Sequence, residues 1–149
     1  ECEPFYINLD KGVNLVRFTA NRNNPNYDYM LLRRVGDQDE IYTKVIKAEG
    51  ENKIEAEKYD AAGSTGNNAV RTEDFTKGDY TGTCLAYMNY VGNYVSYYLN
   101  VEEAGEYNVI LNVANGRAAF DFDPGMEVDG TKFPATINAK QTGDGSGKR

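Results

Sequence analysis

The sequence contains no histidine and no tryptophan, and the first absence excludes several kinds of site. Without an imidazole group there is no Ser-His-Asp triad, no Cys-His pair and no histidine-ligated zinc ion. The two cysteines, Cys2 and Cys84, are far apart in the chain and form no Cys-x-x-Cys motif, which also argues against zinc. We therefore expect neither a zinc site nor nucleophilic catalysis of these types.

Long apolar runs and positive charge are also missing. No stretch approaches the roughly 20 apolar residues that are needed to span a bilayer, so we expect no membrane insertion. The chain begins with Glu1 rather than methionine and shows no signal peptide, so we expect a mature, trimmed or engineered product. The net charge of -7 makes nucleic acid and anionic membrane surfaces unlikely partners. It favours either simple solubility or a site for a hard cation such as Ca²⁺.

The sequence is rich in tyrosine and glycine, with 12 Tyr and 15 Gly among 149 residues. Tyr, Val, Ile and Thr favour strands and Gly favours turns, and this length suits one domain, residues 1–149. Segments of alternating pattern recur at spacings of about 8–12 residues, which predicts an all-β, antiparallel β-sandwich. The predicted strands are residues 5–9, 13–20, 27–33, 54–59, 83–88, 94–101, 105–114, 118–123, 126–129 and 132–139.

Two segments lack a clear strand pattern. Residues 35–53 are polar and charged, and we interpret them as a connector with one short strand within 41–47. Residues 69–79 are expected to be irregular.

Glu55 and Glu57 lie two residues apart on the predicted strand 54–59, so their side chains share one face. Two adjacent carboxylates repel each other unless a cation or a base lies between them. The alternative is a pair of exposed acids on an edge strand. Carboxylate pairs also serve glycosidases, but no acid and nucleophile are placed across a deep cleft here. We therefore expect no enzymatic activity.

Three short motifs follow one another in a recognisable order: Ile-Glu-Ala-Glu at 54–57, Gly-Asn-Tyr-Val-Ser-Tyr at 92–97 and Ala-Gly-Glu-Tyr at 104–107. Together they resemble a carbohydrate-binding module of the family 6 / family 35 type. That resemblance implies a galactose-binding-domain-like jelly-roll sandwich. The motifs that should end the family's chain are found at the front, as Leu-Asp-Lys-Gly-Val-Asn at 9–14 and Asn-Tyr-Asp-Tyr at 26–29.

The resemblance therefore implies that the termini have moved. Residues 54–149 correspond to the family's N-terminal part, residues 35–53 are the connector, and residues 1–34 correspond to its C-terminal part. Three origins fit: circular permutation, a tandem repeat cut in an unusual register, or strand complementation between copies. The sandwich would be completed by the N-terminal strands in cis or from a neighbouring subunit.

The resemblance also implies particular site residues. Glu55, Glu57 and Asp28 match a structural Ca²⁺ site, and Tyr87 and Asn26 match residues of the glycan cleft. The family's partner aromatic is usually a Trp, which this chain lacks, and the alternative role for Tyr87 is packing within the sheet. In the family fold Cys2 and Cys84 would approach each other, either as a disulfide or as two thiols.

Two functions follow from these expectations. The first is a non-catalytic carbohydrate-binding module, secreted or at the cell surface, which binds a polysaccharide or glycan and carries structural calcium. The alternative is a structural subunit of an extracellular fibre or array. Such a subunit would bind copies of itself head to tail by strand complementation.

Overall fold

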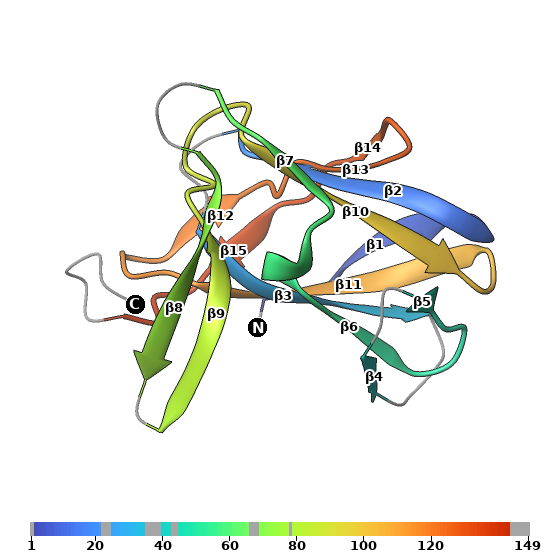
Figure 1. Cartoon of the computed structure of the whole chain (residues 1–149), viewed down its shortest axis with the longest axis horizontal. Coiled ribbons are helices and arrows are strands. Elements are labelled where there is room, and N and C mark those ends of the chain that lie inside the picture. Colours follow the sequence, from blue (N-terminus) through green and yellow to red (C-terminus); the bar gives the residue numbers. More distant parts are fainter. Residues whose placement is uncertain are drawn as a thin grey trace.

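The computed structural model describes residues 2–21, 25–34, 40–42, 45–65, 69–77 and 79–143, and most of them lie in β-strands (Figure 1). The predicted all-β sandwich is confirmed. Two multi-stranded sheets pack against each other, and a two-stranded sheet accompanies them. Most strand pairs are antiparallel, and the two short pairs β4–β6 and β5–β10 are parallel. Within the described residues, no helix is long and apolar enough to cross a bilayer.

The first sheet, sheet A, follows the order β1-β11-β3-β6-β4, and the hairpin β8–β9 joins it through β3. Its strands are β1 (Phe5–Leu9), β3 (Asn26–Arg34), β4 (Glu40–Tyr42), β6 (Glu51–Glu55), β8 (Arg71–Lys77), β9 (Tyr80–Ala86) and β11 (Gly105–Ala114).

The second sheet, sheet B, follows the order β14-β13-β2-β10-β5, and β7 also pairs with β10. A third, two-stranded sheet joins β12 to β15, and a 3-10 turn, η1 (Ala56–Lys58), follows β6. The remaining strands are β2 (Gly12–Thr19), β5 (Val45–Ile46), β7 (Ala61–Gly63), β10 (Tyr94–Val101), β12 (Phe120–Phe122), β13 (Met126–Val128), β14 (Thr131–Phe133) and β15 (Ile137–Ala139).

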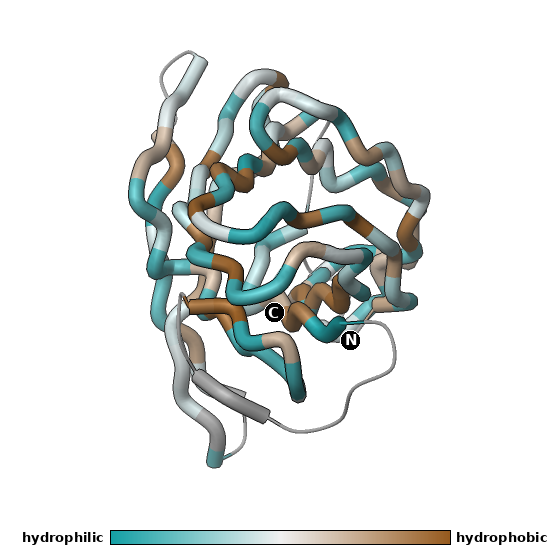
Figure 2. The backbone as a smooth tube through the Cα atoms, turned by 90° about the vertical axis from the view of Figure 1, so that its right-hand side faces the viewer, coloured by the Kyte–Doolittle hydropathy of each residue, from teal (hydrophilic) through white to brown (hydrophobic). Residues whose placement is uncertain are grey.

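The core lies between sheets A and B and is built by the period-two alternation of the long strands. In β10, Val95, Tyr97, Leu99 and Val101 are buried, and the intervening positions from Tyr98 onward are exposed. Burial alternates in the same way along β11, and hydrophobic and hydrophilic stretches follow one another along the backbone (Figure 2). Because successive side chains point to opposite faces, β10 and β11 each contribute an apolar row to the core. β3 differs, because residues on both of its faces are buried.

The N-terminal strands complete the sandwich of their own chain. β1 pairs with β11, β2 pairs with β10 and β13, and β3 lies between β11 and β6. Both ends of the described chain are hydrogen-bonded to β11 or to the residue that follows it. The Cys2 amide donates to the Leu111 carbonyl at 2.8 Å, and the Thr142 amide donates to the Asn115 carbonyl at 2.9 Å.

The expectation that residues 69–79 are irregular is wrong, because Arg71–Lys77 form β8 and pair with β9 along its whole length. The hairpin is stabilised by polar cross-strand contacts, which a search for apolar alternation does not detect. Thr76 and Thr81 hydroxyls are 3.1 Å apart, and the Thr83 hydroxyl donates to Asp74 Oδ1 at 2.8 Å.

The predicted connector is more ordered than expected. Within residues 35–53 the structure has β4, β5 and the first three residues of β6, and positions 35–39 and 43–44 lie outside the described residues. The predicted strand 54–59 is wrong in its second half, because β6 ends at Glu55 and η1 follows. The Tyr97 hydroxyl donates to the Ala56 carbonyl at 2.6 Å, so a contact across the core holds this turn.

Candidate functional site

The tip loop, residues 87–93, begins with an unusual backbone conformation at Tyr87. Its φ angle is 65°, in the left-handed region that bulky residues rarely adopt. Asn93, whose side chain is 0% exposed, donates from Nδ2 to the Tyr87 carbonyl at 2.9 Å. Strained conformations persist where surrounding contacts determine them, and they are concentrated at functional sites.

Backbone hydrogen bonds tie this tip loop to two other segments. The Ala20 amide donates to the Asn93 carbonyl at 2.6 Å, and the Gly92 amide donates back to the Ala20 carbonyl at 2.7 Å. The Thr65 amide donates to Asn93 Oδ1 at 2.9 Å, and Met88 is fully buried beneath the loop. The loop is therefore anchored at its centre and at both ends, so it presents Tyr87 in a defined position.

Two further apolar side chains of the tip loop are exposed. Tyr90 is 40% exposed and Val91 is 67% exposed. Both follow Tyr87 within four residues, so an aromatic and an aliphatic surface lie on the same loop. Tyr90 was not among the cleft residues predicted from the sequence. The available sequence signal was Gly92 two residues later, because glycine favours a turn and a turn exposes its middle residues.

Asn26, the first residue of β3, and Tyr87, which directly follows β9, are the two predicted glycan-cleft residues and lie at the same end of sheet A. The pair Tyr27–Leu85 joins β3 to β9 in antiparallel register. That register brings Asn26 to Ala86, the residue immediately before Tyr87. The structure therefore brings an amide-bearing residue and a tyrosine to one end of sheet A.

Arg71, the first residue of β8, covers one face of the Tyr87 ring. Its Cζ lies 3.9 Å from the ring centroid, and its Nη2 donates to the Tyr87 hydroxyl. The same Nη2 is 3.3 Å from Glu73 Oε1. This contact was not expected, because residues 69–79 were predicted to be irregular.

A second candidate site is the acidic cluster of Asp28, Glu55 and Glu57. Asp28 lies at a β-bulge, since Asn112 pairs with Tyr29 and Val113 pairs with Tyr27, which leaves Asp28 without an opposite residue in β11. Asp28 is buried, and its Oδ2 accepts a hydrogen bond from Asn112 Nδ2 at 2.9 Å. Bulges often redirect a side chain, and here the bulge aims a carboxylate at Asn112.

Glu55 pairs with Tyr29 in the β3–β6 register, so it lies beside the bulge. Its Oε1 is 2.8 Å from Lys53 Nζ, and that ammonium group lies 4.3 Å from the centroid of the Tyr29 ring. Glu57 follows in η1, and its Oε2 is buried with no hydrogen-bond partner among the described residues. A buried carboxylate oxygen without a partner is costly, and it marks a position that a cation would satisfy.

Electrostatic coupling connects these three carboxylates. Burial raises the pKa of Asp28, and the nearby Glu55 and Glu57 charges raise it further. The Asn112 hydrogen bond and the Lys53 charge partly offset this rise. The structure therefore brings Asp28, Glu55 and Glu57 into one neighbourhood.

The cluster differs from the prediction in two respects. Glu55 and Glu57 do not share the face of one strand, because β6 ends at Glu55. In the part of the chain that is described, no three Asp, Glu, Cys or His side chains lie close enough together to hold a metal ion. For Asp28, Glu55 and Glu57 to bind one cation together, their side chains would therefore have to move. Glu55 would also have to break its ion pair with Lys53.

The predicted Cys2–Cys84 disulfide is wrong, because the two buried sulfurs are not bonded. Cys2 belongs to the main core and is hydrogen-bonded through its amide to Leu111 of β11. Cys84 lies on β9 next to Leu85, which points into that core. Alternation along the strand therefore directs Cys84 to the opposite face of β9, away from the core that contains Cys2.

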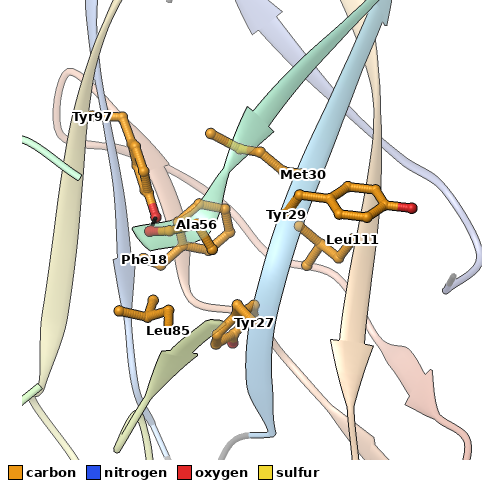
Figure 3. A pocket seen from close by; sticks show the side chains of 8 residues that line it. All are labelled: Phe18, Tyr27, Tyr29, Met30, Ala56, Leu85, Tyr97 and Leu111. Carbon is orange, nitrogen blue, oxygen red and sulfur yellow. Dashed lines mark hydrogen bonds between the residues drawn. The ribbon is translucent and has the colours of Figure 1, made fainter. Parts of the chain in front are cut away.

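The cavity shown in Figure 3 is a packing void in the core rather than a ligand site. Its volume is about 10 Å³, and its lining includes Phe18, Tyr27, Leu85 and Tyr97. This volume is at the lower limit for a single water molecule, and the lining is almost wholly apolar. A sugar ring cannot bind there.

Two other surface features are built from residues outside the tip loop. On the outer face of sheet B, Val13 and Tyr98 are 69% and 54% exposed. An open groove of about 220 Å³ beside β13 and β14 is lined in part by Asn21, Asp123, Glu127 and Lys132. This groove borders the tip loop, because Thr19 and Asn21 line it and flank Ala20, which is hydrogen-bonded to Gly92 and Asn93.

Comparisons of this chain with protein-family models, with curated proteins and with solved structures found no match.

Proposed function

We propose that this protein is a non-catalytic, extracellular carbohydrate-binding module whose glycan site lies at the tip loop. Tyr87 supplies a flat aromatic face on which the C–H groups of a sugar ring pack, and Asn26 supplies an amide that both donates and accepts. Tyr90 offers a second exposed aromatic on the same loop. The resemblance in the motifs at 54–57, 92–97 and 104–107 supports the same function.

One observation carries this proposal more than any other. Tyr87 is held in a left-handed conformation by the fully buried Asn93, although a glycine or asparagine would adopt this conformation at less cost. A packing role does not account for a strained, partly exposed tyrosine at the end of a sheet. A role in which its ring must be presented at a fixed angle does account for it.

Affinity electrophoresis tests the proposal. The wild type and Tyr87→Asn are run through gels that contain soluble xylan, galactomannan, arabinogalactan or mixed-linkage β-glucan. Asparagine tolerates the left-handed backbone, so this variant loses the ring while keeping the loop. We expect at least one polysaccharide to retard the wild type and the retardation to disappear in Tyr87→Asn. Tyr98→Asn, which removes an exposed tyrosine from sheet B, should be retarded like the wild type.

The acidic cluster is proposed to bind a structural Ca²⁺ ion. Carboxylate oxygens are the ligands that Ca²⁺ prefers, and Asp28, Glu55 and the unsatisfied Oε2 of Glu57 would supply three of them. Backbone carbonyls and water would complete the usual six to eight ligands. Bound calcium would hold β3 to β6 and η1, and it would neutralise the repulsion within the cluster.

The alternative function, a subunit of an extracellular fibre or array, has less support. Head-to-tail strand complementation would need N-terminal strands that lack a partner within the chain. β1, β2 and β3 instead pair with β11, β10 and β6 of their own chain. The loss of the expected disulfide also removes one argument for covalent links between copies.

A further inference from the structure

The guanidinium group of Arg71 lies where a sugar would stack on Tyr87. Its Cζ is 3.9 Å from the ring centroid, which is a normal stacking distance, and Nη2 also donates to the ring's own hydroxyl. Arg71 pairs across the hairpin with Ala86, the residue before Tyr87, so the backbone of β8 fixes this arrangement. The covered face of the ring cannot hold a sugar at the same time.

We propose that Arg71 is an intramolecular competitor of the glycan, a proposal that rests on the function proposed above. In the unbound protein Arg71 covers the Tyr87 ring, and a glycan binds by displacing it. The guanidinium then swings away and keeps its second partner, Glu73, whose Oε1 already lies 3.3 Å from Nη2. Arg71 is thus a specificity-determining residue beside the tip loop, although it contributes no binding contact of its own.

The exposure of the Arg71 side chain limits the strength of its contact with the Tyr87 ring. Arg71 has a side chain that is 58% exposed, so water competes for the guanidinium group. An exposed cation–π contact corresponds to a factor of about two to five in an equilibrium constant. The exposed ion pair with Glu73 adds little net preference for either state. The cover is therefore weak enough for a sugar to displace, yet strong enough to reduce affinity measurably.

The contact between Arg71 and Tyr87 also affects which ligands bind. A ligand that packs a broad apolar face on Tyr87 replaces the lost stacking, whereas a small or highly polar one does not. Glycans that reach only the edge of the ring gain nothing to offset the displaced guanidinium. The protein is therefore expected to bind extended chains that also contact Tyr90, and to bind monosaccharides poorly.

The test uses isothermal titration of the whole chain with an oligosaccharide cut from whichever panel polysaccharide retards the proteins most. The variants are Arg71→Ala and the matched control Arg34→Ala, which removes an arginine that is ion-paired with Glu103 at the far end of β3. Thermal unfolding of each variant confirms that it is folded. We expect Arg71→Ala to bind about two- to five-fold more tightly than the wild type and Arg34→Ala to bind equally.

Each other outcome is decisive. If the wild type binds and Arg71→Ala binds equally or more weakly, Arg71 is a bystander or a direct ligand, and this inference is overturned while the glycan function stands. If Arg71→Ala binds and the wild type does not, the site can hold a glycan, but the inference that a glycan displaces Arg71 in the wild type is overturned. If neither is retarded by any panel polysaccharide, the glycan function fails, and this inference fails with it.

Discussion

At the scale of single residues, the bulge at Asp28 is the most consequential feature of the acidic cluster. The bulge leaves Asp28 without an opposite residue in β11 and sets its carboxylate among two other acids. A buried carboxylate near like charges is a cost to the fold unless a cation compensates it. The residue therefore offers a way to test the calcium proposal without knowing the glycan.

We predict that Asp28→Asn stabilises the calcium-free protein and removes most of its response to calcium. Asparagine can still accept from Asn112, so the hydrogen bond survives while the buried charge is removed. In calcium-free buffer the variant should melt at a higher temperature than the wild type. With added Ca²⁺ the wild type should gain about 2.7 kcal/mol at a hundred-fold excess over Kd, and the variant should gain little. Differential scanning calorimetry with and without chelator measures both.

The matched control is Glu106→Gln, which removes the same charge from an exposed position of β11. It should keep the calcium response of the wild type. An equal calcium shift in Asp28→Asn would contradict the assignment of Asp28 as a ligand.

The pH dependence of stability follows from the same carboxyl group. Its ordinary pKa is 3.8 and its folded-state pKa is raised, mainly by burial, so the folded protein binds this proton more tightly than the unfolded chain does. Without calcium, the stability that Asp28 contributes is present below about pH 4 and is lost as the pH rises through the raised pKa. Urea titrations should show this loss in the wild type, and Asp28→Asn should not show it.

At the scale of elements, the strands with strong alternation were predictable and the polar ones were not. The predicted bounds of β1, β10 and β11 agree with the structure, because one buried face imposes a period of two. β8 was missed because it lies in an exposed hairpin whose cross-strand contacts are polar. The 3-10 turn η1 was missed because the hydrogen bond that holds it comes from Tyr97, 41 residues away.

The same distinction applies to the sites. Tyr87 and Asn26 were singled out from sequence motifs, and the pairing of β3 with β9 places them near each other. The contact of Arg71 with Tyr87 could not be predicted, because it depends on β8, which was missed. The cysteines were misjudged because their separation depends on which face of β9 Cys84 occupies. Local pattern predicts which face of a strand is buried, and it does not predict which residues from distant strands meet there.

The junction of β13 with β2 provides a test at this scale. Gly125 has a φ of +64°, and a Cβ built on it would lie 2.1 Å from the Thr19 carbonyl oxygen. Gly130 has a similar φ of +85° but open space around it. We predict that Gly125→Ala lowers the free energy of unfolding by about 1–3 kcal/mol more than Gly130→Ala does, because only the former adds a backbone clash. If urea denaturation shows equal losses of unfolding free energy for the two variants, the backbone near Thr19 accommodates the added Cβ, and the prediction is wrong.

At the scale of the whole molecule, the pairing of β1, β2 and β3 within their own chain predicts a monomer. Light scattering coupled to gel filtration should give the mass of one chain at every concentration tested. Neither reductant nor chelator should change this mass, since no disulfide joins the cysteines and the acidic cluster is built from one chain. Oligomers that dissociate with chelator or reductant would favour the fibre alternative.

The proposed function requires that a glycan bind at the tip loop. Chemical-shift mapping of the ¹⁵N-labelled protein, titrated with the oligosaccharide used for calorimetry, locates the site directly. We predict that the largest changes fall on residues 87–93 together with Asn26 and Arg71. Changes centred instead on Val13 and Tyr98 of sheet B, or on Glu127 and Lys132 of β13 and β14, would contradict the proposed function.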